Sequence, residues 1–229
     1  YLFEHASING ELSLGAGGYL NVSKLKLAGI NNFLKISDIS DKLTLSGVID
    51  SVNLNWKGKL FKPYDFNLAT AFTDVSINSN ESEVPSFNHL NGSINARESS
   101  GQIKLKLTNA SFSYPKYIYQ SYQINQFNSE LNWQLESNNN VNLTWQQTNL
   151  QTPELNLTRF GNYKQAESHL NATINLNYLK LNQIYKLLPT SFSKATLKDL
   201  QTNLKAGSLN NIQIKINGKP QNFPFKNES

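Results

Sequence analysis

Apolar and polar residues alternate along most of this chain. In one example, Ile103, Leu105 and Leu107 are separated by single polar residues. A period of two places every second side chain on the same side of an extended strand. We therefore predict strands with one apolar and one polar face at 43–49, 54–56, 66–72, 103–107, 131–135, 141–145, 155–157, 170–176 and 212–216, with a break at Gly58.

Short polar segments separate the alternating stretches. Residues 97–102 and 136–140 are rich in Glu, Ser, Asn and Gly. Such loops typically join neighbouring antiparallel strands as hairpins. A weak repeat of about 40 residues relates 87–115 to 127–153, a spacing seen in stacked repeats and also produced by a plain β-meander.

Helical spacing of apolar residues occurs in one place only. Residues 181–188 carry it up to Pro189, which cannot continue a helix. Ser193 is a suitable N-cap for a second helix that passes Leu204 and ends at Gly207. We predict two short helices joined by residues 190–192, and strand or loop elsewhere.

The chain of 229 residues is long enough to bury a core and contains no Met. The missing Met indicates either a mature product or a piece of a longer protein, and we interpret the chain as a single piece of a longer protein. It divides into preceding strands (1–40), a sheet of β-hairpins (41–178), a helical insertion (179–207), and a returning strand with a truncated end (208–229). Its apolar runs are far shorter than the roughly 20 residues that span a bilayer, so any membrane anchor is expected outside this piece.

The net charge of +5 first suggests a nucleic-acid partner. The lysines, however, come in pairs spaced two apart, such as Lys24 with Lys26 and Lys104 with Lys106, which places them on the polar faces of strands. Arginine, the residue that nucleic-acid readers favour, occurs only twice. We expect no nucleic-acid partner.

Motifs for catalysis or metal binding are absent from the sequence. His5, His89 and His169 lie far apart, and there is no His-Glu-x-x-His, nucleophile-elbow or P-loop motif. Asp38 and Asp41 lie near Asp50 without the spacing of a calcium loop. The absence of Cys excludes disulfides and thiolate zinc sites. We expect no enzyme, no cofactor and no metal.

The apolar side of the predicted sheet needs a cover. On the order of ten one-sided strands present more apolar surface than two short helices can bury, and exposed patches beyond a few hundred Å² mark interfaces or binding sites. Three arrangements solve this: a closed sandwich or barrel, which is the commonest, packing against segments outside this piece, or an open groove that takes acyl chains.

Several segments resemble, in order, the periplasmic region of YhdP-type AsmA-like proteins, which are related in architecture to TamB. In the strand region they are 47–58 (GVIDSVNLNWKG), 72–78 (FTDVSIN), 84–87 (VPSF), 90–94 (LNGSI), 101–107 (GQIKLKL) and 127–134 (FNSELNWQ). In the C-terminal part they are 184–189 (IYKLLP), 207–209 (GSL) and 222–225 (NFPF). Asn222 stands where the family often has Asp, and Gly207 stands alone where it has two glycines. The likeness covers residues 30–225.

The resemblance implies a mainly β fold: a long twisted, curled antiparallel sheet with two short helices near the C-terminal part. It also implies a periplasmic location in a Gram-negative bacterium, an inner-membrane anchor outside this piece, and non-enzymatic phospholipid transport between the inner and outer membranes. The partners would be phospholipid acyl chains.

We predict that alternate apolar side chains line the lipid groove, and that the helices between Leu181 and Leu204 cap or gate it. The candidates are Leu45, Leu54, Trp56, Phe66, Leu68, Phe72, Ile94, Leu105, Leu131, Trp133, Leu143, Trp145, Ile174, Leu176 and Ile214. One alternative is a scaffold that pairs its sheet edges with envelope proteins. Another is a carbohydrate-binding or hydrolytic β-domain, which requires the tryptophans on the exposed face.

Overall fold

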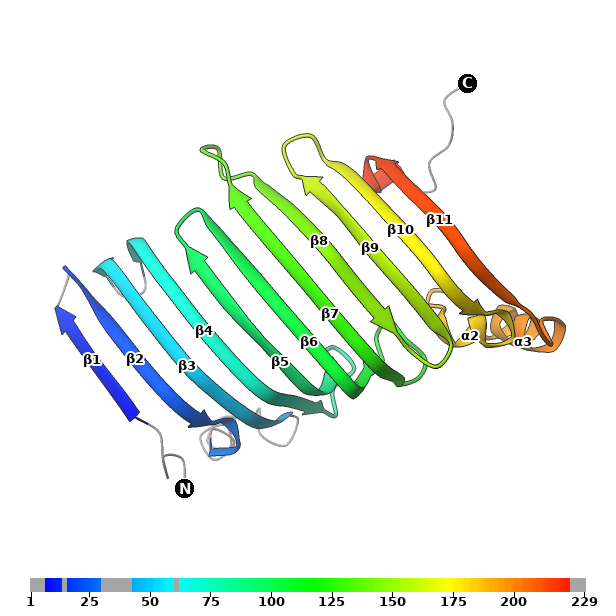
Figure 1. Cartoon of the computed structure of the whole chain (residues 1–229), viewed down its shortest axis with the longest axis horizontal. Coiled ribbons are helices and arrows are strands. Elements are labelled where there is room, and N and C mark those ends of the chain that lie inside the picture. The colour runs from blue at the N-terminus through cyan, green and yellow to red at the C-terminus, as the bar shows by residue number, and fades with distance from the viewer. Residues whose placement is uncertain (1–6, 14–15, 30–42, 60–61, 223–229) are drawn as a thin grey trace.

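One antiparallel sheet dominates the computed structural model, which describes residues 7–13, 16–29, 43–59 and 62–222. Its 11 strands lie side by side in chain order, and β1 and β11 form opposite ends of an open sheet (Figure 1). The strands are β1 (Ser7–Ser13), β2 (Gly17–Lys26), β3 (Leu43–Lys59), β4 (Lys62–Ser79), β5 (Ser86–Arg97), β6 (Ser100–Ser113), β7 (Tyr122–Leu135), β8 (Val141–Gln151), β9 (Leu155–Lys164), β10 (His169–Lys180) and β11 (Ser208–Gly218).

The predicted fold class is confirmed, and the closed sandwich or barrel is wrong. Every alternating segment lies in a strand, and the 87–115 and 127–153 repeats correspond to the hairpins β5–β6 and β7–β8. The turn at 136–140 lies between β7 and β8 as expected, whereas the turn at 97–102 is only two residues long. The break expected at Gly58 corresponds to a register shift at this glycine and to the end of β3 one residue later, at Lys59.

The helical insertion follows β10 and is short. A 3₁₀ turn (Leu181–Gln183) leads into one turn of α2 (Ile184–Leu187), and α3 covers Lys194–Asn203. The predicted end of this helix at Gly207 is wrong, because Leu204 is already its C-cap. Ser193 caps α3 as predicted, because its hydroxyl accepts a hydrogen bond from the Thr196 N–H at 3.0 Å. Among the described residues, no helix is long and apolar enough to cross a membrane.

Strand pairing gathers the apolar side chains on one side of the sheet, here called the apolar face. Directly paired residues of antiparallel strands share a face. Three rows cross the sheet in this way. They are Leu54–Leu68–Ala96–Gly101–Trp133–Leu143, Phe72–Gly92–Leu105–Ser129–Thr148–Arg159–Ile174–Ile214, and Leu107–Phe127–Leu150–Leu157–Leu176–Ile212.

β-Bulges change the phase of the alternation so that the apolar face stays apolar. On β3, Ile49 pairs with Phe72 and Val52 pairs with Thr70, so an odd-numbered apolar series gives way to an even-numbered one across Asp50. Similar register shifts occur on β4, β8 and β10. A bulge inserts one extra residue and bends its strand. These irregularities therefore keep long strands one-sided while bending them.

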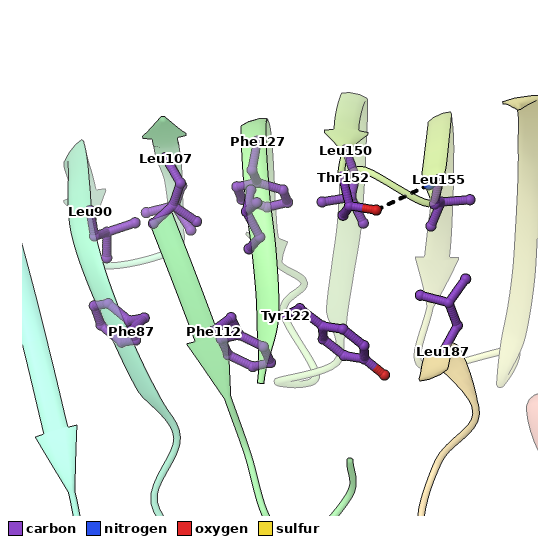
Figure 2. Close-up of a pocket in the computed structure, with 12 residues that line it drawn as sticks. Phe87, Leu90, Leu107, Phe112, Tyr122, Phe127, Leu150, Thr152, Leu155 and Leu187 are labelled. Atoms are coloured by element: carbon purple, nitrogen blue, oxygen red, sulfur yellow. Dashed lines mark hydrogen bonds between the residues drawn. The ribbon is translucent and has the colours of Figure 1, made fainter. Parts of the chain in front are cut away.

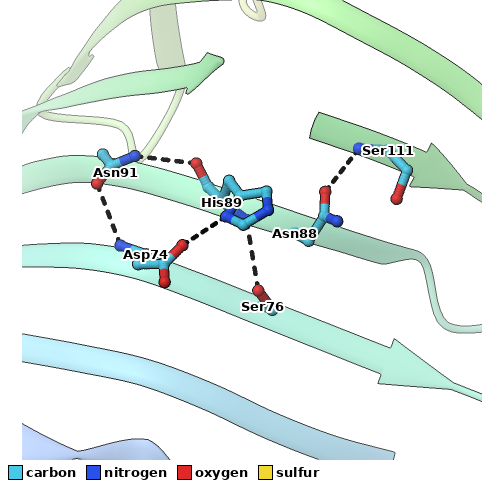
Figure 3. A network of polar contacts seen from close by, with 6 residues as sticks. All are labelled: Asp74, Ser76, Asn88, His89, Asn91 and Ser111. Atoms are coloured by element: carbon cyan, nitrogen blue, oxygen red, sulfur yellow. Dashed lines mark hydrogen bonds and ion pairs between the residues drawn. The ribbon is translucent and has the colours of Figure 1, made fainter. Parts of the chain in front are cut away.

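The bulges on β4 and β5 are held by a polar network (Figure 3). Asp74 and His89 both have left-handed backbone conformations, and the His89 ring nitrogen lies 2.7 Å from the Asp74 carboxylate. Asn91 accepts a hydrogen bond from the Asp74 N–H at 3.1 Å, and Ser76 accepts one from the His89 N–H at 3.3 Å. Side chains thus satisfy backbone groups that the interrupted ladder leaves without partners.

A second polar group lies at the bulge of β3. The Asp50 carboxylate accepts hydrogen bonds from Lys24 at 2.7 Å and from Thr73 at 2.5 Å. These two donors, Lys24 first, hold the pKa of Asp50 below its ordinary value. The carboxylate therefore remains charged, and keeps both contacts, over the whole neutral range.

Large aromatic rings on the apolar face lie over glycines of neighbouring strands. Gly101 pairs with Trp133, and a methyl group on that glycine would overlap the indole ring, with Cε2 at 2.6 Å. A methyl group on Gly18 would lie 2.7 Å from Cζ2 of its partner Trp56. The glycines let these rings lie flat against the sheet, so the tryptophans cover their own part of the apolar face.

Candidate functional site

A hollow of about 520 Å³ opens on the apolar face between β5 and β9 (Figure 2). Ten of its twelve lining side chains are hydrocarbon or phenyl groups, and only Tyr122 and Thr152 carry a hydroxyl. Its lining consists of Phe87, Leu90, Leu105, Leu107, Phe112, Tyr122, Ile124, Phe127, Leu150, Thr152, Leu155 and Leu187. Neither a charged group nor an amide side chain lines it. This hollow is the best candidate for a binding site in the described part of the chain.

Two clusters of buried side chains form the floor and one wall of the hollow. Leu107, Ala110 and Ile124 make the first cluster, and Leu155 belongs to the second. Leu150 packs against both clusters and so joins them. Between Leu107 and Ala110 the strand bulges at Asn109, which has a left-handed backbone conformation. The bulge turns both residues to the apolar face, where they pack into the same buried cluster with Ile124.

Thr152 closes the turn between β8 and β9 beside the hollow. Its hydroxyl accepts hydrogen bonds from the Leu155 N–H at 3.0 Å and the Glu154 N–H at 3.2 Å. The Thr152 N–H in turn donates to the Leu155 carbonyl at 2.7 Å. The polar atoms of this buried threonine are thereby satisfied within the turn. Thr152 consequently presents its methyl group and no free donor to a ligand.

The helical insertion, here called the lid segment (residues 181–207), covers the lower end of the hollow. Leu187 of α2 lines the hollow, and Ile184 and Leu187 pack against the second cluster. Figure 1 places α2 and α3 at the lower edge of the sheet, beside β9 to β11. This location is consistent with the predicted role of the helices as a cap.

Hydrogen bonds fasten the lid segment to the loop between β6 and β7 and to the first residue of β7. The Tyr122 hydroxyl donates to the Lys186 carbonyl at 2.7 Å, and the Tyr119 hydroxyl donates to the Phe192 carbonyl at 2.7 Å. The Thr190 N–H donates to the Tyr117 carbonyl at 2.9 Å. Burial raises the pKa of Tyr122, so its phenol stays protonated and remains a donor at neutral pH.

Replacing both Tyr119 and Tyr122 with Phe is expected to loosen the lid segment. Each lost hydrogen bond costs about 1 kcal/mol, so amide hydrogen exchange over residues 184–203 should accelerate by about tenfold or more. Tyr64→Phe is the matched control, because Tyr64 is exposed on β4 and its hydroxyl makes no described hydrogen bond. Equal exchange in the double variant and the control would show that these bonds do not hold the lid.

The hydrogen bond from Tyr122 to Lys186 also predicts a loss of stability at alkaline pH. Because the pKa of Tyr122 is raised in the folded protein, the unfolded chain loses this proton first as the pH rises. The contribution of Tyr122 to stability is therefore present below the ordinary tyrosine pKa of about 10 and is lost as the pH passes through the raised value. In urea unfolding, the Tyr122→Phe variant should not show this decrease in the free energy of unfolding at alkaline pH.

The sequence-predicted groove residues all lie on the apolar face, but few line the hollow. Leu105 does, and Leu176 belongs to the neighbouring buried cluster. Leu45 reaches the same face through its pairing with Ile77, which pairs with Phe87. The other candidates lie in rows farther up the strands or towards either end of the sheet: Leu54, Trp56, Phe66, Leu68, Phe72, Ile94, Leu131, Trp133, Leu143, Trp145, Ile174 and Ile214.

Most of the lining was missed because it belongs to strand ends where the alternation is interrupted. Phe87 and Leu90 are three residues apart on β5, with the bulge at His89 between them. Phe112 and Tyr122 pair with each other across a long loop. The density of Phe, Tyr and Leu between 105 and 127 was the available signal.

The histidines of the described residues make local contacts within the sheet. No group of three or more His, Asp or Glu residues is placed to hold a metal ion in that part of the chain. His89 contacts Asp74 in the bulge network, and His169 contacts Asn217 at 2.5 Å across β10 and β11. His5, Asp38 and Asp41 lie outside the described residues.

Comparison with known families shows which family the chain belongs to. The family model described as YhdP protein matches residues 4–229. The chain belongs to the YhdP family. No curated protein and no solved structure matches it significantly. The matched residues include both the β-hairpin sheet and the lid segment.

Proposed function

We propose that this YhdP-family chain binds acyl chains of phospholipids on its apolar face and passes them along without chemical change. The observation that carries the proposal is the hollow of about 520 Å³ with an almost wholly hydrocarbon lining, located on an open sheet. Water in such a space lacks hydrogen-bond partners. An acyl chain gains about 0.8 kcal/mol for each methylene group that leaves water.

The sheet supports movement as well as binding. Apolar rows run across the strands in both directions from the hollow, so a chain that leaves it meets further apolar side chains, such as Leu157 and Leu176. Trp56 and Trp133 lie flat over Gly18 and Gly101 and leave a shallow surface there. The hollow is therefore a site where an acyl chain stays bound, and the shallower rows beside it are a surface along which the chain moves. The process is passive, because contact with apolar side chains needs no reacting group.

The proposed setting is the periplasm of a Gram-negative bacterium, with phospholipid moving between the inner and outer membranes and an inner-membrane anchor supplied outside this chain. Membership of the YhdP family supports this setting. The exposed lysines of the polar face, such as Lys24 and Lys104, suit an aqueous compartment on that side.

A second candidate function is a scaffold for envelope proteins. The exposed Leu209 and Ile214 of β11 favour it, because these apolar side chains lie on a strand that pairs only with β10 among the described residues. Photo-crosslinking from β11 distinguishes the two functions. A scaffold yields protein adducts at this strand, whereas lipid transport yields lipid adducts along the apolar face.

Extraction of the purified chain with organic solvent, followed by mass spectrometry, tests the proposed function. We expect phospholipid to co-purify in a fixed ratio to protein and to be retained after gel filtration in detergent-free buffer. A chain purified from the same cells that carries no phospholipid above the level found on an unrelated β-protein would contradict the proposal.

A further inference from the structure

An arginine lies on the apolar face next to the hollow. Arg159 of β9 pairs with Thr148 on one side and with Ile174 on the other, which fixes its side chain to the apolar face. It follows Leu157 by two residues, a separation of about 7 Å along a strand. Leu157 pairs with Leu150, which lines the hollow. A permanent positive charge therefore lies one residue pair beyond the hydrocarbon lining.

Two hydroxyl groups share the row of Arg159. Ser129 and Thr148 are directly paired, and their hydroxyls lie 2.9 Å apart. Thr148 is only 3 % exposed, which is unusual for a polar side chain on a face made mostly of hydrocarbon. Ser129, Thr148 and Arg159, here called the polar belt, thus run across three adjacent strands above the hollow.

The donors of the belt have no anionic partner within the described chain. None of the described carboxylates forms an ion pair with Arg159. Its guanidinium carbon lies 5.4 Å from the centre of the Trp145 ring, a cation–π contact that positions the group and leaves its N–H donors free. The indole N–H of Trp145 is itself buried and donates to no acceptor. Both partners of the stack therefore lack an acceptor.

We propose that the polar belt binds the phosphate oxygens of a lipid headgroup while an acyl chain of the same molecule lies in the hollow. Arginine suits this role because its planar fork donates two parallel hydrogen bonds to a phosphate. One of the Ser129 and Thr148 hydroxyls donates to the other, so this pair leaves one further hydroxyl donor on the same side. This inference rests on the proposed function, because it assigns the headgroup end of the same bound lipid.

The belt also makes the bound lipid directional. With the phosphate at Arg159, the acyl chain extends towards Leu150 and the lid segment, and its end lies near Leu187. The lid segment then meets the tail and not the headgroup. A lipid therefore enters with its headgroup towards the upper ends of the strands and its tail towards the lower edge of the sheet.

Equilibrium binding of two short-chain lipids with identical acyl chains tests the proposal. One is a phosphatidic acid and the other is the uncharged diacylglycerol, and inorganic phosphate is the third probe. For the delipidated wild-type chain we expect the phosphatidic acid to bind about tenfold or more tighter than the diacylglycerol. Inorganic phosphate alone should bind far more weakly than either lipid.

The Arg159→Gln variant should remove the preference and leave diacylglycerol binding unchanged. Arg159→Lys keeps the charge without the fork and should retain part of the preference. Arg97→Gln is the matched control, because Arg97 lies at the end of β5, outside the belt. Circular dichroism and tryptophan fluorescence confirm that each variant is folded.

The outcomes separate the two proposals. Equal binding of both lipids to the wild-type chain, or an unchanged preference in Arg159→Gln, overturns the headgroup assignment and leaves the acyl-binding hollow intact. Inorganic phosphate that binds as tightly as phosphatidic acid shows a free-phosphate site and also overturns the assignment. Failure of both lipids to bind overturns the proposed function together with the assignment.

Discussion

The Leu150→Asp variant is expected to lose its bound lipid. Leu150 lines the hollow and packs against both buried clusters, so a carboxylate at this position faces the middle of the hydrocarbon lining. A charge kept beside an acyl chain loses hydration without gaining a partner, which costs several kcal/mol. We expect co-purifying phospholipid, measured by mass spectrometry per mole of protein, to fall by about tenfold or more.

Two further variants make this result specific. Phe160→Asp is the matched control, because Phe160 is exposed on β9 and pairs with Thr173 on the polar face, and its lipid content should equal that of the wild-type chain. Leu90→Trp fills the hollow without adding charge and should also exclude lipid. Normal lipid content in both Leu150→Asp and Leu90→Trp would mean that lipid binds somewhere other than the hollow.

The Gly161→Ala variant is expected to be clearly less stable than the wild-type chain. Gly161 lies between Trp145 on β8 and Ala172 on β10. A methyl group there would overlap the Asn171 carbonyl oxygen and lie 2.8 Å from the Ala172 Cα. These are backbone atoms, so β9 and β10 must separate to admit it. We expect a loss of about 1–3 kcal/mol, seen as a lower urea midpoint.

Gly10→Ala provides the comparison for this prediction. Gly10 also lies within a strand, but its nearest neighbour to an added methyl group is the Tyr19 carbonyl oxygen at 3.1 Å, in the pair of strands at one end of the sheet. Its free energy of unfolding should change by less than about 0.5 kcal/mol. Equal midpoint shifts for the two variants would show that β9 and β10 adapt easily at Gly161.

The alternation of apolar residues was sufficient to predict the strands and their one-sidedness. It succeeded because side-chain direction has a period of two in any extended strand, as at Ile103, Leu105 and Leu107. The two helices were also predictable from the sequence, because Pro189 and Ser193 act through local backbone and capping chemistry. The choice of an open sheet over a sandwich came from the family resemblance and not from the pattern.

The position of the hollow depends on cross-strand register, which the pattern does not encode. Phe87, Phe112 and Tyr122 are far apart in sequence and become neighbours only through the pairing of β5, β6 and β7. Bulges such as those at His89 and Asn109 change the phase of the alternation without a clear signal, because Asn and His occur throughout the chain. Strict alternation therefore identified the correct face but few residues of the site.

The position of Arg159 on the apolar face could not be predicted from the sequence either. In the sequence it was one of two arginines and counted only as evidence against nucleic-acid binding. Its place on the apolar face follows from the pairing of β9 with β8 and β10, and its contact with Trp145 crosses between strands. A charged residue in the apolar phase of a strand is the signal to search for in related chains.

Site-specific photo-crosslinking in cells tests most directly whether lipid occupies the apolar face. Leu105 and Lys106 are consecutive residues of β6 whose side chains lie on opposite faces, Leu105 in the hollow and Lys106 exposed on the polar face. With a benzophenone amino acid at each position in turn and radiolabelled phospholipid, a lipid adduct is expected at position 105 and not at 106. Adducts of equal yield at both positions, or at 106 alone, would contradict a lipid path on the apolar face.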